Sequence, residues 1–165
     1  MFVTWDTFFT PEVPSIAREL NQLGYTTSFV GKWHNGEPEM ADPKHIHREY
    51  GDDPELLQAK LEELGIADNT LVIFTSDHQS RGKFSVYESC RVPAVAIWPE
   101  GIEPGTIIDD ICANIDLLLT AVDLAGGGAP DSTDGLSFRE NLLTGSGPDA
   151  YIRLYATCAF NENLL

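Results

Sequence analysis

Residues 70–75 carry the sequence Thr-Leu-Val-Ile-Phe-Thr, an unbroken apolar run with turn-forming residues on both sides. A run this short and continuous favours a strand buried on both faces, as in a parallel sheet covered by helices. The polar residues 76–79 (Ser-Asp-His-Gln) follow it directly. In open α/β sheets the ligand site lies beyond the carboxyl ends of the strands, so this strand is predicted to end at a functional site.

Helices and short apolar strands alternate along the rest of the chain. Helical spacing of apolar residues predicts helices over residues 14–23, 54–64, 110–125 and 137–143, and short apolar runs predict strands over residues 26–30, 92–98 and 151–157. Asp109 or Asp110 is the expected N-cap of the third helix, and the polar residues 36–53 are expected to form a long loop. This order predicts an α/β fold with a mostly parallel sheet flanked by helices, in a single domain of residues 1–165.

The composition is that of an ordinary globular protein with a strong acidic bias. Of 165 residues, 42% are apolar and 22% are charged, and 26 acidic against 10 basic side chains give a net charge of −16. Such a chain repels phosphate backbones and anionic membranes, so nucleic-acid and membrane partners are not expected. No apolar run approaches the ~20 residues of a membrane helix. Residues 1–6 show no basic region before a hydrophobic stretch, so no signal peptide is predicted.

The cysteines Cys90, Cys112 and Cys158 are widely spaced and form no Cys-x-x-Cys pair. Neither a disulfide framework nor a thiolate zinc site is therefore predicted. All are expected to be small buried or half-buried thiols.

Two polar clusters follow predicted strands. Residues 31–36 (Gly-Lys-Trp-His-Asn-Gly) follow the first strand, and residues 76–79 follow the apolar strand. If both strands are parallel in one sheet, five polar side chains converge at one edge: Lys32, His34, Asp77, His78 and Lys83. A carboxylate beside an imidazole suits a divalent cation, the ammonium groups suit a small anion, and the second imidazole suits proton transfer near neutral pH. The competing interpretation is that both clusters are ordinary solvated turns.

The same residues resemble the sulfatase family. Gly24-Tyr25-Thr26-Thr27 followed by residues 31–36 is similar to its Gly-Tyr-x-Thr and Gly-Lys-Trp-His-Leu-Gly segments, with Asn35 in place of Leu. Residues 61–78 are similar to the family's helix, strand and metal-binding turn. The similarity continues in family order through Gly82-Lys83, Tyr87-Glu88, Arg91-Val92-Pro93, residues 116–125 and Asp134-Gly135-Leu136-Ser137. Because several motifs occur in the right order, strongest over residues 14–36 and 53–143, the resemblance is specific.

The resemblance implies both a fold and a site. The family has a large α/β sheet of the alkaline-phosphatase-like type, and this chain would form part of it. Its members hydrolyse sulfate esters, and some relatives cleave phosphate or phosphonate esters. By resemblance, Asp77 and His78 ligate a divalent metal, usually calcium. Lys32 and Lys83 would hold the oxygens of sulfate or a small anionic ester, and His34 would contact the nucleophile, so that cations stabilise the transferred group.

The family's nucleophile has no match in this chain. It is a formylglycine made within a Cys/Ser-x-Pro-x-Arg motif, which none of the cysteines begins, so a formylglycine is not expected. The family's first metal-binding strand is also unmatched, and Gln79 replaces the usual Gly. The stretch between Gly36 and Asp52 is short and leaves His45 or His47 as weak candidates for a family histidine. A missing strand favours a homo-oligomer or packing against a partner segment.

Three functions are consistent with these patterns. The first is a sulfuric ester hydrolase by family, with a metal and sulfate half-site but impaired catalysis. The second is a non-catalytic anion-binding, metal-binding or partner protein on the same fold. The third is a metal-dependent phosphate or phosphonate ester hydrolase that uses an activated water and needs no formylglycine.

Overall fold

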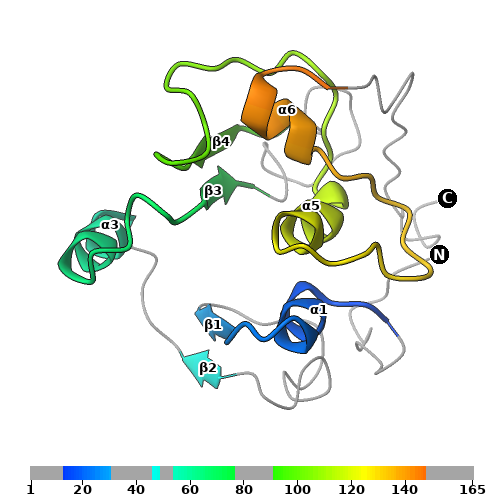
Figure 1. The fold of residues 1–165 in the computed structure, drawn as a ribbon, viewed down its shortest axis with the longest axis horizontal. Coiled ribbons are helices and arrows are strands. Elements are labelled where there is room, and N and C mark those ends of the chain that lie inside the picture. Colours follow the sequence, from blue (N-terminus) through cyan, green and yellow to red (C-terminus); the bar gives the residue numbers. More distant parts are fainter. Residues whose placement is uncertain (1–12, 31–45, 49–53, 77–90, 148–165) are drawn as a thin grey trace, which may run out of the picture.

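The computed structural model describes residues 13–30, 46–48, 54–76 and 91–147. Its elements in chain order are α1 (Ile16–Gln22), β1 (Ser28–Val30), β2 (Ile46–Arg48), α3 (Pro54–Glu63), β3 (Val72–Thr75), β4 (Ala94–Ile97), α5 (Asp116–Leu124) and α6 (Arg139–Thr144). In Figure 1, α5 lies between α6 above and α1 below, and α3 lies at the far left beyond the β3–β4 pair. No helix in the described ranges has the length and hydropathy to cross a membrane.

Two helices begin and end where local signals predict. The Ser15 side chain caps α1 by accepting a hydrogen bond from the Arg18 backbone nitrogen at 3.3 Å, and Gly24 follows the helix with a φ of 92°. α3 starts at Pro54 and is followed by Gly65 with a φ of 66°. Glycine suits both positions because a side chain is strained at such positive φ values. The predicted helices over residues 14–23 and 54–64 are thereby confirmed.

α5 begins later than predicted, at Asp116, and neither Asp109 nor Asp110 caps it. The Asp110 carboxylate instead accepts hydrogen bonds from Asn141 Nδ2 at 2.7 Å and from the Gly147 backbone nitrogen at 3.3 Å. The predicted cap was wrong because an aspartate before an apolar run can satisfy donors that are distant in sequence instead of a local helix end.

The described strands form two separate two-stranded sheets. β1 pairs with β2 in parallel, with Ser28 opposite Ile46, and β3 pairs with β4 in antiparallel fashion, with Val72 opposite Ile97. A mixed α/β fold is thus confirmed, whereas the described strands do not form one mostly parallel sheet. β2 also lies within residues 36–53, which were predicted to form a loop. Strand composition favours extended backbone but does not specify the partner or direction of pairing, which depends on contacts distant in sequence.

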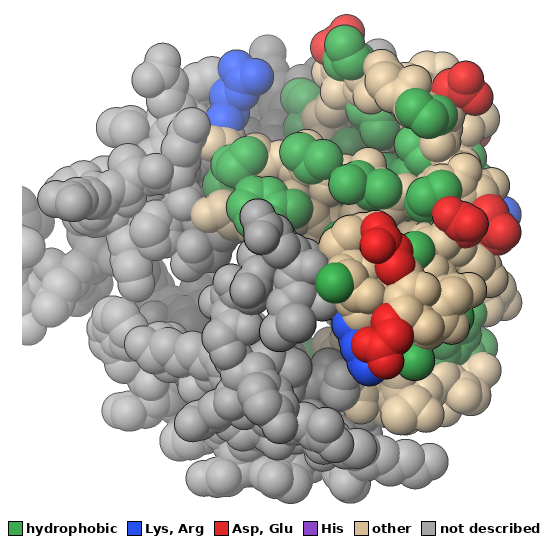
Figure 2. Space-filling model, turned by 90° about the vertical axis from the view of Figure 1, so that its left-hand side faces the viewer, with side chains coloured by type: hydrophobic (Ala, Val, Ile, Leu, Met, Phe, Trp, Pro, Cys, Tyr) green, Lys and Arg blue, Asp and Glu red, His purple; other side chains and the backbone are tan. Residues whose placement is uncertain are grey.

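β3 is not buried on both faces. Ile73 and Phe74 are 36% and 59% exposed, and Val95 and Ile97 on β4 are 55% and 57% exposed. Figure 2, which views the side carrying α3, shows hydrophobic side chains lying open beside acidic ones. The burial prediction is wrong here because pairing with β4 satisfies one edge of β3 but covers neither of its faces.

The buried core surrounds α5, against which α1 and α6 pack (Figure 1). Its apolar members are Leu119 and Val122 of α5 and Leu142 of α6, each at most 7% exposed. Polar side chains are buried beside them, namely Asp116, Thr120 and Asn141. Because a buried polar group is costly unless it is hydrogen-bonded, this core depends on the polar contacts that these residues make.

Candidate functional site

The side chains predicted to form the site lie outside the described residues: Lys32, His34, Asp77, His78 and Lys83. The same holds for His45, Cys90 and Cys158, and for the side chain of His47. The structure does describe the strands that lead into this region, since β1 ends at Val30 and β3 at Thr75. These strands belong to different sheets in the described part of the chain, so they do not by themselves bring the two loops to one edge. The convergence of the five side chains stays a prediction.

The end of β3 is held by a side chain that sequence reasoning did not single out. Asn114 Nδ2 donates a hydrogen bond to the backbone oxygen of Ser76 at 2.9 Å, and Asn114 Oδ1 accepts one from Thr75 Oγ1 at 3.3 Å. These contacts join residues nearly forty positions apart in the sequence. They attach the last described position before Asp77 to the segment that precedes α5.

Asp116 organises that segment from inside the core. Asp116 is only 1% exposed. Its two carboxylate oxygens accept hydrogen bonds from different backbone nitrogens. Oδ2 accepts from Ala113 at 2.7 Å, and Oδ1 accepts from Leu136 at 2.9 Å. One carboxylate therefore joins the approach to α5 with the approach to α6. The sequence signal for this contact is that Asp116 and residues 134–137 lie in two successive segments that resemble family motifs.

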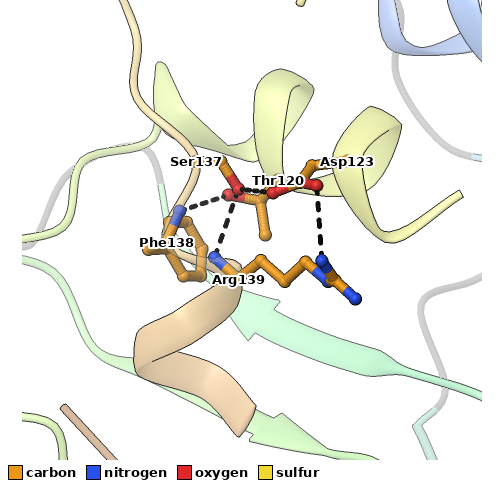
Figure 3. Close-up of polar contacts among 5 residues, drawn as sticks. All are labelled: Thr120, Asp123, Ser137, Phe138 and Arg139. Atoms are coloured by element: carbon orange, nitrogen blue, oxygen red, sulfur yellow. Dashed lines mark hydrogen bonds and ion pairs between the residues drawn. The ribbon is translucent and has the colours of Figure 1, made fainter. Parts of the chain in front are cut away.

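Figure 3 shows the adjoining contacts between α5 and the start of α6. Thr120 Oγ1 donates to the Asp116 backbone oxygen at 2.8 Å and accepts from the Phe138 backbone nitrogen at 3.0 Å. Ser137 Oγ donates to Asp123 Oδ2 at 2.7 Å, and Arg139 Nη1 lies 3.7 Å from Asp123 Oδ1. These contacts join α5 to the start of α6, so the cluster is a structural junction between the two helices.

The groove beside this junction does not suit an anionic ester. It has a volume of about 550 Å³ and is lined by Leu119 and Asp123 of α5 and by residues 127, 129–133 and 135–137. Its charged lining residues are Asp123 and Asp131, and no lysine or arginine lines it. Since carboxylates repel a sulfate or phosphate group, the groove is not a candidate substrate site.

The described residues contain no group of three or more His, Cys, Asp or Glu side chains that could hold a metal ion. Asp110 and Asp116, the carboxylates nearest in sequence to Asn114, accept hydrogen bonds from protein donors. The donor chemistry of Asp77 and His78 nevertheless fits a divalent cation, because it combines a carboxylate oxygen with an imidazole nitrogen. Sulfatases typically depend on calcium.

Cys112 is a free thiol and is exposed, contrary to the expectation of a buried or half-buried side chain. Although the residue as a whole is exposed, partial loss of solvent around its sulfur raises the pKa of the thiol, and the negative charges of Asp116 and Asp110 raise it further. We expect iodoacetamide to alkylate Cys112 several-fold more slowly than free cysteine near neutral pH, because the thiolate is the reacting form. Peptide mapping by mass spectrometry over a pH series measures this rate. Because the folded chain favours the protonated thiol, the alkylation rate of Cys112 should rise at higher pH than that of an ordinary cysteine thiol.

The Asp110→Asn variant tests how much a neighbouring negative charge contributes to the raised pKa of Cys112. Removing one negative charge should shift the midpoint of the Cys112 alkylation profile to lower pH. A Cys112 rate equal to or faster than that of free cysteine at neutral pH would contradict the expectation.

Comparisons with known proteins define the class to which this fold and sequence belong. The family model for the C-terminal region of N-sulphoglucosamine sulphohydrolase matches residues 77–160, about half of the chain. The match begins at Asp77, directly after the end of β3 and its contact with Asn114. The chain belongs to the sulfatase family, which confirms the resemblance drawn from its motifs.

Individual relatives agree with this assignment. The chain is 37% identical over 107 residues to the ulvan-active sulfatase of Formosa agariphila, an alignment that covers 64% of this chain and 21% of the relative. It is 36% identical over 117 residues to arylsulfatase A of Homo sapiens, covering 60% of this chain and 23% of that protein. The chain therefore spans about a fifth of the length of these curated relatives.

Two solved structures are similar in both fold and sequence. One is a protein in complex with its substrate D-glucosamine-2-N,6-O-disulfate, with a TM-score of 0.53 and 29% identity over 59% of this chain and 22% of that one. The other is a phosphonate monoester hydrolase from Silicibacter pomeroyi, with a TM-score of 0.51 and 34% identity over 58% of this chain and 20% of that one. The described elements are thus part of a mixed α/β sulfatase or phosphonate hydrolase fold.

Proposed function

We propose that this chain carries the metal- and sulfate-binding half of a sulfatase site and has impaired turnover. The observation that carries the proposal is the family match that starts at the Asp77-His78 pair, at the carboxyl end of β3. Ligand sites of α/β sheets lie at this end of a strand. We also propose that residues 1–165 act as one domain.

The roles follow from the charge and chemistry of each side chain. Asp77 and His78 ligate a divalent cation, with calcium as the expected ion. Lys32 and Lys83 contact the oxygens of a sulfate group, and His34 donates or accepts a proton beside it. Local cations are essential for anion binding here, because the chain as a whole carries a net charge of −16. Bound metal supplies further stabilisation of the negative charge on the transferred group.

Impaired turnover follows from the missing nucleophile. None of Cys90, Cys112 and Cys158 begins a Cys/Ser-x-Pro-x-Arg motif, so this chain offers no residue for conversion to formylglycine. The structures that the chain resembles suggest the class of ligand. One relative binds a sulfated sugar, so a small sulfate ester is the first candidate. The similarity to a phosphonate monoester hydrolase favours a phosphonate or phosphate ester as the second, cleaved by a metal-activated water.

Calorimetry on the full chain tests this proposal. We expect calcium to bind and inorganic sulfate to bind weakly in its presence, whereas an aryl sulfate releases no product. Lys32→Ala should weaken sulfate binding about tenfold, the effect of losing roughly 1.4 kcal/mol from one charge-assisted contact. Lys60→Ala is the matched control, since the Lys60 ammonium lies on the surface 2.9 Å from Glu63 and should not affect sulfate.

The possible outcomes separate the candidate functions. Rapid aryl sulfate hydrolysis that is lost in Lys32→Ala would overturn the claim of impaired turnover. Absence of calcium binding would overturn the half-site, and hydrolysis of an aryl phosphate or phosphonate but not of a sulfate would select the second candidate. Binding of calcium and sulfate without turnover of any ester supports the non-catalytic form of the proposal.

A further inference from the structure

We propose that Asn114 is a positioning residue for the Asp77-His78 pair, an inference that rests on the proposed function of that pair. The Asn114 side chain connects the end of β3 to the segment before α5. Asn114 Nδ2 donates to the Ser76 backbone oxygen at 2.9 Å, and Asn114 Oδ1 accepts from Thr75 Oγ1 at 3.3 Å.

The orientation of Asn114 is set by the backbone on both sides of it. The Asp116 backbone nitrogen donates to the Ala113 oxygen at 2.9 Å, and the Leu117 nitrogen donates to the Asn114 oxygen at 3.3 Å. The Ala113 nitrogen in turn donates to the buried Asp116 carboxylate at 2.7 Å. Because the carboxylate is anchored in the core, the backbone that carries the exposed Asn114 side chain is tied to that core.

Covalent geometry transmits this contact to the proposed metal ligands. The Ser76 carbonyl oxygen and the Asp77 backbone nitrogen belong to the same planar peptide group. A hydrogen bond to this oxygen therefore restrains the orientation of the Ser76–Asp77 peptide plane, which includes the Asp77 backbone nitrogen. Residues that orient metal ligands in this way raise affinity, because less conformational freedom is lost when the ion binds.

Calcium titration of matched variants tests the inference. Asn114→Ala is expected to weaken calcium binding about fivefold, the effect of losing one hydrogen bond of ordinary net strength. Thr75→Val removes only the longer contact, so it should have a smaller effect. Asn69→Ala changes an exposed asparagine in the turn before β3 and should leave calcium affinity unchanged. Terbium luminescence on the full chain provides a second measurement of the same site.

Melting temperatures in a calcium chelator distinguish positioning from general stability. A positioning role predicts that calcium-free Asn114→Ala melts close to the parent chain while its calcium affinity falls. If the parent chain binds calcium and Asn114→Ala binds it equally well, the positioning role is wrong while the proposed metal site stands. If calcium-free melting falls but affinity does not, the contact serves folding alone and the inference is overturned. If the parent chain binds no calcium, both proposals fail.

Discussion

Asp116→Ala is expected to lower the free energy of unfolding by about 3 kcal/mol, since it leaves two partly buried backbone donors without their acceptor, at about 1–3 kcal/mol each. The Asp116 residue is 1% exposed, and its carboxylate accepts from Ala113 at 2.7 Å and from Leu136 at 2.9 Å. Urea unfolding followed by circular dichroism measures the effect. The loss is large because the Asp116 side chain is itself buried, so its removal also leaves a gap in the core.

Asp123→Ala is the matched control for this substitution. Its carboxylate accepts a hydrogen bond from Ser137 Oγ at 2.7 Å and lies 3.7 Å from the Arg139 guanidinium, but its side chain is 42% exposed. Because water can replace both exposed contacts, this variant should lose less than about 1 kcal/mol and stay close to the parent chain. Equal losses for the two variants would show that burial of the Asp116 carboxylate is not the source of its effect.

Gly135→Ala is expected to destabilise the chain by about 2 kcal/mol, within the range for inserting atoms into a well-packed core. A Cβ at this buried position would overlap the backbone oxygen of Ile115 and lie 3.2 Å from the Asp116 Cα. Both neighbours are backbone atoms at the start of α5, so they cannot move aside as a flexible side chain does. The added methyl group would therefore push residues 135–136 away from α5 and weaken the hydrogen bond from the Leu136 nitrogen to Asp116.

Gly128→Ala separates this steric effect from the general effect of replacing glycine. A Cβ at Gly128 meets no atom within 4 Å, and its φ is not in the positive region. This control should be neutral or more stable by up to about 1 kcal/mol, because alanine restricts the unfolded chain. Thermal unfolding of both variants, compared with the parent chain, measures the difference. A neutral Gly135→Ala would contradict the close approach of this loop to α5.

Local signals were sufficient for much of the secondary structure. Ser15 and Gly24 delimit α1, and Pro54 and Gly65 delimit α3, because each signal acts through neighbouring backbone groups. The start of α5 was missed because Asp110 hydrogen-bonds to Asn141 and Gly147, which are distant in the sequence. No local pattern distinguishes an aspartate with distant partners from one that caps the next helix.

The candidate site likewise has one part that could be inferred from the sequence and one part that could not. Its chemistry, with Asp77 and His78 as metal ligands and Lys32 and Lys83 as anion contacts, was inferred from residue types and motif order, and it stays a proposal. The contact that holds the end of β3 could not be predicted from the sequence. The role of Asn114 at the end of β3 depends on a contact across nearly forty residues, which only the folded chain reveals.

Family membership, the positions of most helices and strands, and the residue types proposed for metal and sulfate binding can be inferred from the sequence without coordinates. Family motifs and helix ends are carried by residues close together in the chain, so they can be recognised without coordinates. Three features became visible only in the folded chain: the antiparallel pairing of β3 with β4, the exposure of that apolar pair, and the hydrogen bonds by which Asp116 anchors the segments before α5 and α6. These features depend on which distant groups meet in space and how much solvent they exclude, and neither is encoded in a local pattern.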